Sequence, residues 1–364
     1  MKEKKTLNYY SAPGRVCLYG EHQDYLKLIV VPAAINLRTK IGLKLNQSNT
    51  IKVKSQELKT EDKFDINHKI SLKNNEYDYL RAIIIILIKE GIIEKIPGLD
   101  VEILSEVPIG SGLSSSAALL VSWLTALNEE LNLALDKQEI AYICFKAENQ
   151  VLGINCGIMD QYASSLGGIF SLNCDGPPFE IQKYQTVFPK IIIGDSLVRR
   201  AANEPLTFLK KQLNDGIKRI QENKKDILKT LSFDELQKFK GILSVEENKR
   251  LNGVIAIREI TKQACQELSK KKNHDHSLLG TLLTEQQKAL RDYLEVSTPE
   301  LDKLIKISLE NGALGAKLTG AGFGGCIIVY APDKEKEVAD AINRAGGKAI
   351  VCKVDPLGGK REMQ

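Results

Sequence analysis

The sequence predicts an α+β protein with two domains, and three observations indicate this fold class. The chain has 364 residues, 43% of them hydrophobic, so it can bury a large core and exceeds the usual length of one domain. Strand-like and helical patterns mix up to about residue 190. After residue 315 the pattern is strand, glycine-rich turn, strand, helix and strand. We therefore expect an N-terminal α+β domain over residues 1–190 and a C-terminal α+β domain over residues 191–364.

The expected elements of the N-terminal domain follow from the spacing of apolar residues. Alternating apolar side chains predict strands, and longer amphipathic or aliphatic runs predict helices. Strands are expected at residues 39–45, 51–55, 99–107 and 169–172, and helices at residues 77–89, 115–131 and 136–149. The last of these helices begins at Asp136, a residue type that caps helix N-termini. Residues 153–168 are rich in loop-forming residues.

The C-terminal domain is expected to begin with a strand at residues 191–195. Long, charged, helical segments with few glycines occupy residues 204–294. Strands are then expected at residues 316–319, 326–330 and 349–354, with a helix at residues 333–344. The sequence has neither internal repeats nor low-complexity segments.

Composition excludes several classes of protein. The 51 basic and 46 acidic residues are spread along the chain and give a net charge of only +5, which disfavours a dedicated nucleic-acid binder. No segment approaches the ~20 apolar residues of a membrane span, and the N-terminus lacks the apolar core of a signal peptide. The seven cysteines form no CxxC pair and are expected to be reduced thiols. We expect a soluble cytoplasmic protein, monomeric or homodimeric, without nucleic acid or membrane as a partner.

Residues 107–120, VPIGSGLSSSAALL, predict a turn that opens a helix and could hold an anion. A helix N-terminus offers unpaired N–H groups and a partial positive charge, and glycines allow a ligand to approach the backbone closely. Ser114, Ser115 and Ser116 could add hydrogen bonds, and one of them could ligate Mg²⁺. The segment fits neither common phosphate loop, because no lysine follows Gly112 and Ser115 stands where a dinucleotide fingerprint has its third glycine. The alternative is a turn with a serine N-cap.

Residues 12–25, APGRVCLYGEHQDY, place polar residues at the end of an apolar strand. Arg15 lies within the strand, and a buried arginine needs a carboxylate or phosphate partner. The strand ends in Glu21, His22, Gln23 and Asp24, which could be polar simply because a strand end is exposed.

Residues 156–168, CGIMDQYASSLGG, contain an isolated carboxylate, Asp160, among small and apolar residues. It would be partly desolvated and would need an arginine or a hydroxyl as partner, unless it caps a short helix. Upstream, Glu148 is either a surface residue or a metal ligand near the serines. Four glycines within residues 320–325 predict a tight hairpin or a backbone wall against a ligand.

These motifs, in this order, resemble the GHMP kinases over residues 11–332. Within that family, GEHQDY and CGIMDQYAS are similar to the galactokinase-like sugar kinases. The resemblance implies a ribosomal-protein-S5 domain-2-like N-terminal domain and a ferredoxin-like C-terminal domain, with the site between them. It also implies ATP and Mg²⁺ as cofactors.

The resemblance implies a role for each matching residue. Asp160 matches the catalytic aspartate and Arg15 its arginine partner, while Ser116 and Glu148 would ligate Mg²⁺. The implied ATP-binding residues are Pro108, Gly110, Ser111, Gly112, Leu113, Ser114, Ser115 and Ser116. The implied sugar-binding residues are Glu21, His22, Asp24 and Gly157. The loop 320–325 would brace the nucleotide.

The implied activity is transfer of the γ-phosphoryl group of ATP to a monosaccharide, at the anomeric C1 hydroxyl. Cys17 and Leu26 depart from the galactokinase pattern, so galactose, an N-acetylated hexosamine, L-fucose, L-arabinose and a uronic acid all remain candidate substrates. Two other functions stay open: a kinase of a non-sugar molecule such as mevalonate, and a non-catalytic sensor of sugar and ATP.

Overall fold

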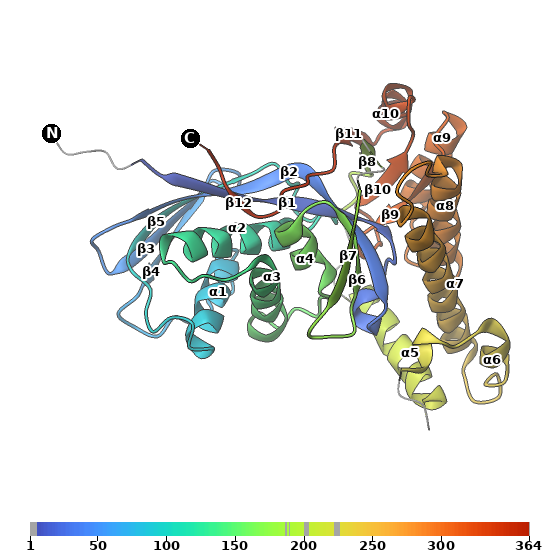
Figure 1. The fold of residues 1–364 in the computed structure, drawn as a ribbon, viewed down its shortest axis with the longest axis horizontal. Coiled ribbons are helices and arrows are strands. Elements are labelled where there is room, and N and C mark those ends of the chain that lie inside the picture. Colours follow the sequence, from blue (N-terminus) through green and yellow to red (C-terminus); the bar gives the residue numbers. More distant parts are fainter. Residues whose placement is uncertain (1–5, 186–187, 189, 200–203, 222–225, 364) are drawn as a thin grey trace.

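The computed structural model contains two β-sheets, each packed against its own set of helices (Figure 1). It describes residues 6–185, 188, 190–199, 204–221 and 226–363. The predicted α+β class is confirmed. Among the described residues, no helix is long and apolar enough to cross a membrane.

The first sheet is built on two long antiparallel strands, β1 (Asn8–Tyr19) and β2 (Ile29–Leu45). Its strand order is β12-β1-β2-β5-β3-β4, with β6 pairing to β2 and β7 to β6. The other strands are β3 (Thr50–Ser55), β4 (Thr60–Asp65), β5 (Leu99–Ser105), β6 (Ile169–Asn173), β7 (Glu180–Tyr184) and β12 (Lys360–Arg361). The register of β1 against β2 shifts between Pro13 and Arg15 and again between Cys17 and Tyr19. Such irregularities redirect side chains and are common beside functional sites.

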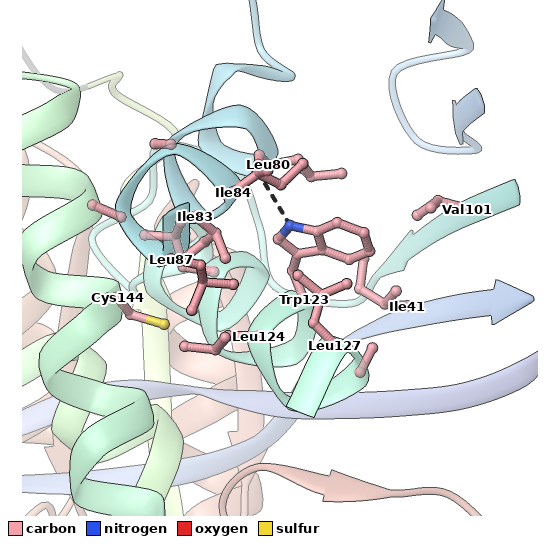
Figure 2. Packing of buried hydrophobic residues seen from close by; sticks show 14 of the residues in the cluster. Ile41, Leu80, Ile83, Ile84, Leu87, Val101, Trp123, Leu124, Leu127 and Cys144 are labelled. Carbon is pink, nitrogen blue, oxygen red and sulfur yellow. Dashed lines mark hydrogen bonds between the residues drawn. The ribbon is translucent and has the colours of Figure 1, made fainter. Parts of the chain in front are cut away.

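Helices α1 to α4 cover one face of this sheet (Figure 1). They are α1 (Asp78–Lys89), α2 (Ser115–Glu130), α3 (Lys137–Lys146), which continues into a π-helical segment (Ala147–Val151), and α4 (Met159–Leu166). Figure 2 shows Trp123 of α2 buried between α1 and the sheet. Its Nε1 donates to the carbonyl of Leu80 at 3.2 Å, so the indole is both packed and hydrogen-bonded.

The second sheet has the strand order β11-β8-β10-β9, and all its pairings are antiparallel. Its strands are β8 (Ile191–Asp195), β9 (Gly315–Thr319), β10 (Cys326–Tyr330) and β11 (Lys348–Cys352). The helices on and around it are α5 (Glu204–Ile220), α6 (Phe233–Gln237), α7 (Val245–Leu268), α8 (His276–Asp292), α9 (Pro299–Glu310) and α10 (Glu335–Arg344). Short 3₁₀ turns occur at Asp24–Leu26 and Ile227–Lys229. The predicted series of strand, turn, strand, helix and strand is confirmed.

The chain returns to the first sheet at its C-terminal end. Strand β12 pairs with β1, and Val354 forms a bridge with Ile35. Arg38, only 8% exposed, pairs with Asp355 and donates to the carbonyl of Gly358 at 2.6 Å. The last residues of the chain therefore complete the first sheet, although they follow the second sheet in sequence.

Candidate active site

A buried arginine and a cavity-lining aspartate form the centre of the candidate site. Arg15 on β1 donates from Nε to Asp160 Oδ1 and from Nη2 to Asp160 Oδ2, both at 2.7 Å. The Arg15 side chain is 5% exposed, whereas that of Asp160, on the first turn of α4, is 29% exposed. Nη1 of Arg15 also donates to the carbonyl of Gly112 at 2.6 Å. The expectation that each of these charged groups has a charged or hydroxyl partner is confirmed. The guanidinium also connects Asp160 to residues 108–116, which we call the serine loop.

Ser114 provides the second contact to Asp160. Its Oγ donates to Asp160 Oδ2 at 2.5 Å, and its backbone is left-handed, with φ +62°. Ser114 occupies the N-cap position of α2, but its side chain accepts no hydrogen bond from the helix. The alternative of a serine N-cap is wrong for Ser114, because its hydroxyl turns to the carboxylate of Asp160 instead. The Ser114 hydroxyl therefore does not compete with an anion for the amide groups at the start of α2.

The other residues of the serine loop divide into lining and supporting residues. Gly110 and Gly112 have φ values of +72° and +87° and line a cavity together with Ser114, Ser115 and Ser116. The supporting residues are Pro108, whose carbonyl accepts from Ser111 Oγ at 2.8 Å, and Leu113, which is 1% exposed and accepts from the Arg15 amide.

The glycine-rich loop 320–325 packs against the serine loop. It turns between β9 and β10, as the hairpin interpretation predicted. A Cβ atom added to Gly320 would lie 3.0 Å from the carbonyl oxygen of Gly112, and one added to Gly112 would lie 3.0 Å from that of Thr319. The two backbones therefore meet at a distance that larger residues would not permit.

The cavity has a volume of about 420 Å³, within the size range of ligand pockets. One part of its wall consists of Arg15, Asp160 and the serine loop. Another part consists of Glu57 and Leu58 in the turn after β3, together with Tyr77 and Tyr79 at the start of α1. Thr39 and Ile103 of the central strands complete the lining with Ser55, Glu76, Ser105, Ile109 and Leu119.

Glu148 lies behind Ser116, on the π-helical segment. Its carboxylate accepts from Gln161 Nε2 at 2.6 Å and from the Ser116 hydroxyl. The side chain is 5% exposed, and burial raises its pKa to about 7. A carboxylate and a hydroxyl are donors that suit Mg²⁺, which takes its remaining ligands from water and nucleotide phosphates. In the described part of the chain, no group of three or more His, Cys, Asp or Glu side chains could hold a metal ion.

Asp24 and Gly157 lie in direct contact beside this centre. A Cβ atom added to Gly157 would lie 1.6 Å from Asp24 Oδ2, so a larger residue there would displace the Asp24 carboxylate. Burial, followed by the negative charge of Asp160, raises the pKa of Asp24 to about 6. This coupling indicates that the two carboxylates share one site. His22 is 5% exposed, and its Nδ1 lies 3.0 Å from the hydroxyl of Tyr25.

Glu21 is engaged by the second sheet. Its carboxylate pairs with Lys317 Nζ at 2.5 Å and accepts from the Gly320 amide at 2.6 Å. Glu21 is 2% exposed and Lys317 is fully buried. Lys317 also donates to the carbonyl of Cys17 at 2.9 Å. The structure thus brings Glu21 to the interface between the two sheets, and its contact with a substrate stays a prediction.

Sequence reasoning missed two residues of the site. Gln161, the donor to Glu148, lies within the quoted CGIMDQ segment and could have been considered there. Lys210 of α5 is 6% exposed and donates from Nζ to the carbonyl and to Oδ1 of Asn155, at 2.6 and 3.2 Å. Its Nζ also lies 4.3 Å from the centre of the Tyr25 ring. No local signal identifies Lys210, because it is one of many lysines on a charged helix.

Three family models match this sequence. The GHMP kinases N terminal domain covers residues 78–168, and the GHMP kinases C terminal model covers residues 262–348. The galactokinase galactose-binding signature covers residues 2–44. The first range contains the serine loop and Asp160, and the third contains Arg15 and Asp24.

Relatives match over nearly the whole chain. The galactokinase of Pyrococcus furiosus is 32% identical over 92% of each chain. The mevalonate kinase of Pyrococcus abyssi is 31% identical over 96% of each chain. The crystal structure of Lactococcus lactis galactokinase complexed with galactose superposes with a TM-score of 0.88, at 27% identity, over 99% of this chain and 96% of that one.

Proposed function

This chain belongs to the GHMP kinases, which are ATP-dependent, and we propose that it phosphorylates a monosaccharide, preferably galactose, at the anomeric C1 hydroxyl. The observation that carries the proposal is Asp160, held by Arg15 at the wall of a cavity that the serine loop also lines. The galactose-binding signature over residues 2–44 supports the choice of sugar, as does the likeness to a galactokinase complexed with galactose.

The serine loop is proposed to hold the phosphates of ATP. The amide groups at the start of α2 and the helix dipole stabilise negative charge there. Positive φ at Gly110 and Gly112 brings their backbone to the cavity without a side chain in the way. This charge stabilisation is the main requirement of phosphoryl transfer.

Asp160 is proposed to act on the acceptor. Asp24, His22 and Gly157 would hold the sugar hydroxyls so that O1 lies near Asp160 and the γ-phosphorus. A bond forms between O1 and the γ-phosphorus, the bond from that phosphorus to the β–γ bridging oxygen breaks, and ADP leaves. The proton of the hydroxyl passes to Asp160, and Arg15 and Ser114 orient the carboxylate that receives it.

Magnesium is proposed to bind at Ser116 and Glu148 together with the nucleotide. The carboxylate and hydroxyl found there fit this ion. When bound, Mg²⁺ neutralises charge on the phosphates. Gln161 holds Glu148 toward the ion through its hydrogen bond of 2.6 Å.

A substrate panel tests the proposal. ATP consumption is measured with purified protein and each of a set of free monosaccharides, with mevalonate included because of the 31% identical relative. The phosphorylated position is then located by NMR. We expect turnover with galactose and a product phosphorylated at C1. Turnover with mevalonate alone would assign the non-sugar function, and binding of sugar and ATP without turnover would assign a sensor.

A further inference from the structure

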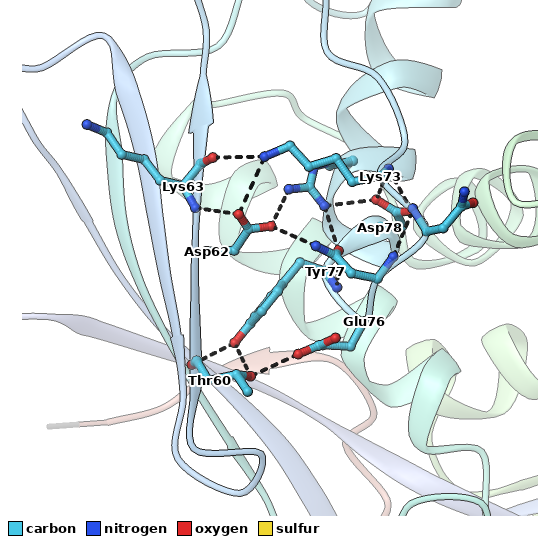
Figure 3. Close-up of polar contacts among 10 residues, drawn as sticks. Thr60, Asp62, Lys63, Lys73, Glu76, Tyr77 and Asp78 are labelled. Carbon is cyan, nitrogen blue, oxygen red and sulfur yellow. Dashed lines mark hydrogen bonds and ion pairs between the residues drawn. The ribbon is translucent and has the colours of Figure 1, made fainter.

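The β3–β4 hairpin is fastened to the start of α1 by buried ion pairs (Figure 3). Arg81 of α1, 1% exposed, pairs through Nη2 with Asp62 of β4 and donates from Nη1 to Asp78 Oδ1 at 2.8 Å. Its guanidinium also lies 4.0 Å from the centre of the Phe64 ring on β4. Asn75 connects the same groups: it accepts from Arg81 at 2.8 Å and donates to Asp62 at 3.2 Å. We call Asp62, Asn75, Asp78 and Arg81 the hairpin clamp.

A second link joins the same strand to the same helix start. The hydroxyl of Tyr77 donates to the carbonyl of Thr60 at 2.7 Å, and Thr60 Oγ1 donates to Glu76 Oε1 at 2.9 Å. Thr60 and Asp62 are two residues apart on β4, so their side chains share one face of the strand. The face of β4 toward α1 is therefore held at two successive positions.

These contacts connect the two chain segments that form two walls of the cavity. On one side is the turn between β3 and β4, with Ser55, Glu57 and Leu58, and on the other are Glu76 and Tyr77. β4 lies at the end of the sheet and takes its ladder hydrogen bonds from β3. Contacts to α1 therefore determine where the turn lies relative to the helix start. The same cavity extends to the serine loop and Asp160.

We propose that the hairpin clamp sets the affinity for the nucleotide, by fixing the separation of the cavity walls that enclose the part of ATP beyond its phosphates. This rests on the proposed function, since it takes the cavity as the ATP site. Asp62 and Arg81 do not line the cavity and act through the hairpin, so they are positioning residues. The clamp acts on the nucleotide and leaves the acceptor and the chemical step unaffected.

The test compares two charge removals on one strand. Asp62→Asn removes the partly buried carboxylate that pairs with the buried Arg81, whereas Glu61→Gln removes an exposed carboxylate that pairs with Lys54 at 3.3 Å. Binding of ATP to the full chain is measured by calorimetry, and kcat and both KM values by steady-state assay. Asp62→Asn is expected to raise the Kd and KM for ATP about tenfold, the scale of one lost charge-assisted contact. Its kcat and acceptor KM should stay within about twofold of the unmodified chain. Glu61→Gln should change none of these values.

A milder variant covers the case in which Asp62→Asn does not fold. Thr60→Val removes only the hydroxyl contacts to Glu76 and Tyr77 and is expected to raise the Kd for ATP several-fold. The clamp is overturned if Asp62→Asn and Thr60→Val bind ATP as tightly as Glu61→Gln does while the sugar assay works. If no sugar is phosphorylated but the Kd values follow the expected order, the clamp is supported and the proposed acceptor is wrong.

Discussion

At the scale of single residues, the site depends on the contrast between a buried arginine and the partly exposed carboxylate that it holds. Each of the three guanidinium nitrogens of Arg15 donates a hydrogen bond, two to Asp160 and one to the carbonyl of Gly112, so the side chain has little freedom to reorient. Asp160 keeps part of its surface toward the cavity. This arrangement would orient Asp160 as the proposed base without covering it.

Asp160→Asn is therefore expected to lower kcat by about 10²–10⁴-fold, the usual contribution of a general base. The amide retains the shape of the side chain but accepts a proton poorly. The Kd for ATP should change little, because the amides of the serine loop hold the phosphates. Steady-state kinetics and calorimetry measure the two quantities, and an unaltered kcat would remove Asp160 from the mechanism.

Asp24 is expected to make acceptor binding depend on pH. Its pKa is raised from 3.8 to about 6, mainly by burial and then by the charge of Asp160. As the pH falls through about 6 the carboxylate is protonated and loses its ability to accept hydrogen bonds from sugar hydroxyls. The acceptor KM is therefore expected to rise below about pH 6, and initial rates measured at saturating ATP and Mg²⁺ between pH 5 and 8 would show it.

The raised pKa of Asp24 also lowers the free energy of unfolding at neutral and higher pH. A carboxyl whose pKa is higher in the folded state favours folding at a pH below its unfolded value, and this advantage is lost as the pH rises through about 6. Asp24→Asn should therefore melt at a higher temperature than the unmodified chain at pH 8, with the difference vanishing near pH 4. It keeps an oxygen acceptor for the Tyr25 amide but should lose acceptor binding. An equal melting temperature at pH 8 would contradict the shift.

At the scale of elements, helix α5 supports the loop that carries Gly157. Lys210 of α5 donates a hydrogen bond to the carbonyl of Asn155. Its ammonium group lies over the Tyr25 ring and is attracted by the negative charge of Asp24. The loop leads directly into α4 and Asp160. A helix of the second half of the chain thus fixes the acceptor side of the site.

Lys210→Met is expected to raise the acceptor KM several-fold and to leave the KM for ATP unchanged, because the loop loses its anchor while the serine loop does not. Removing the cation also removes an interaction that lowers the pKa of Asp24. The pH at which the acceptor KM rises should therefore shift upward, an effect that mere loosening of the loop would not produce. The exposed neighbour Lys211→Met is the control and should match the unmodified chain.

The helices and strands that were predicted correctly have clear capping residues or a clear spacing of apolar residues. Those that were missed lack these signals. Helix α3 begins with the expected cap at Asp136, and the structure adds a capping box in which the Asp136 amide donates to the Glu139 carboxylate. Strands β4 and β7 were missed because their sequences, TEDKFD and EIQKY, carry few apolar residues at the edge of the sheet. The predicted helix to residue 149 instead changes to a π-helical segment at Ala147.

The residues in and around the candidate site also divide into those that the sequence predicted and those that it did not. The rule that a buried charge needs a partner predicts that Arg15 and Asp160 each have one. Their pairing with each other, across 145 residues of sequence, was implied only by the family resemblance. Asp62 and Lys210 were not predicted, because charged residues in polar segments look like ordinary surface residues. Arg81 was also not predicted, although it directly precedes the aliphatic run 82–88. Only the tertiary structure reveals their burial.

At the scale of the whole molecule, the end of β1 is held by elements of the second half of the chain. The hydroxyl of Tyr19 donates to the carbonyl of Leu279 at 2.7 Å, and the Gly20 amide donates to Gln286 Oε1 at 3.1 Å. The ion pair of Glu21 and Lys317 follows directly. His22 and Asp24, which we expect to hold the acceptor, are therefore positioned by the contact between the two sheets.

This contact gives a prediction that separates two roles of Glu21. Lys317→Met leaves the carboxylate buried without its cation, which should lower the free energy of unfolding by about 3–5 kcal/mol in urea titrations. Adding Glu21→Gln removes the buried charge as well and should restore most of that loss. Lys317→Met is also expected to raise the acceptor KM, since the same contact positions His22 and Asp24. If Glu21 only links the two sheets, adding Glu21→Gln should lower this KM again as it restores stability. If Glu21 also contacts the sugar, stability should return while the KM stays raised. A loss below about 1 kcal/mol for Lys317→Met, the range of exposed pairs, would show that the pair does not stabilise the contact.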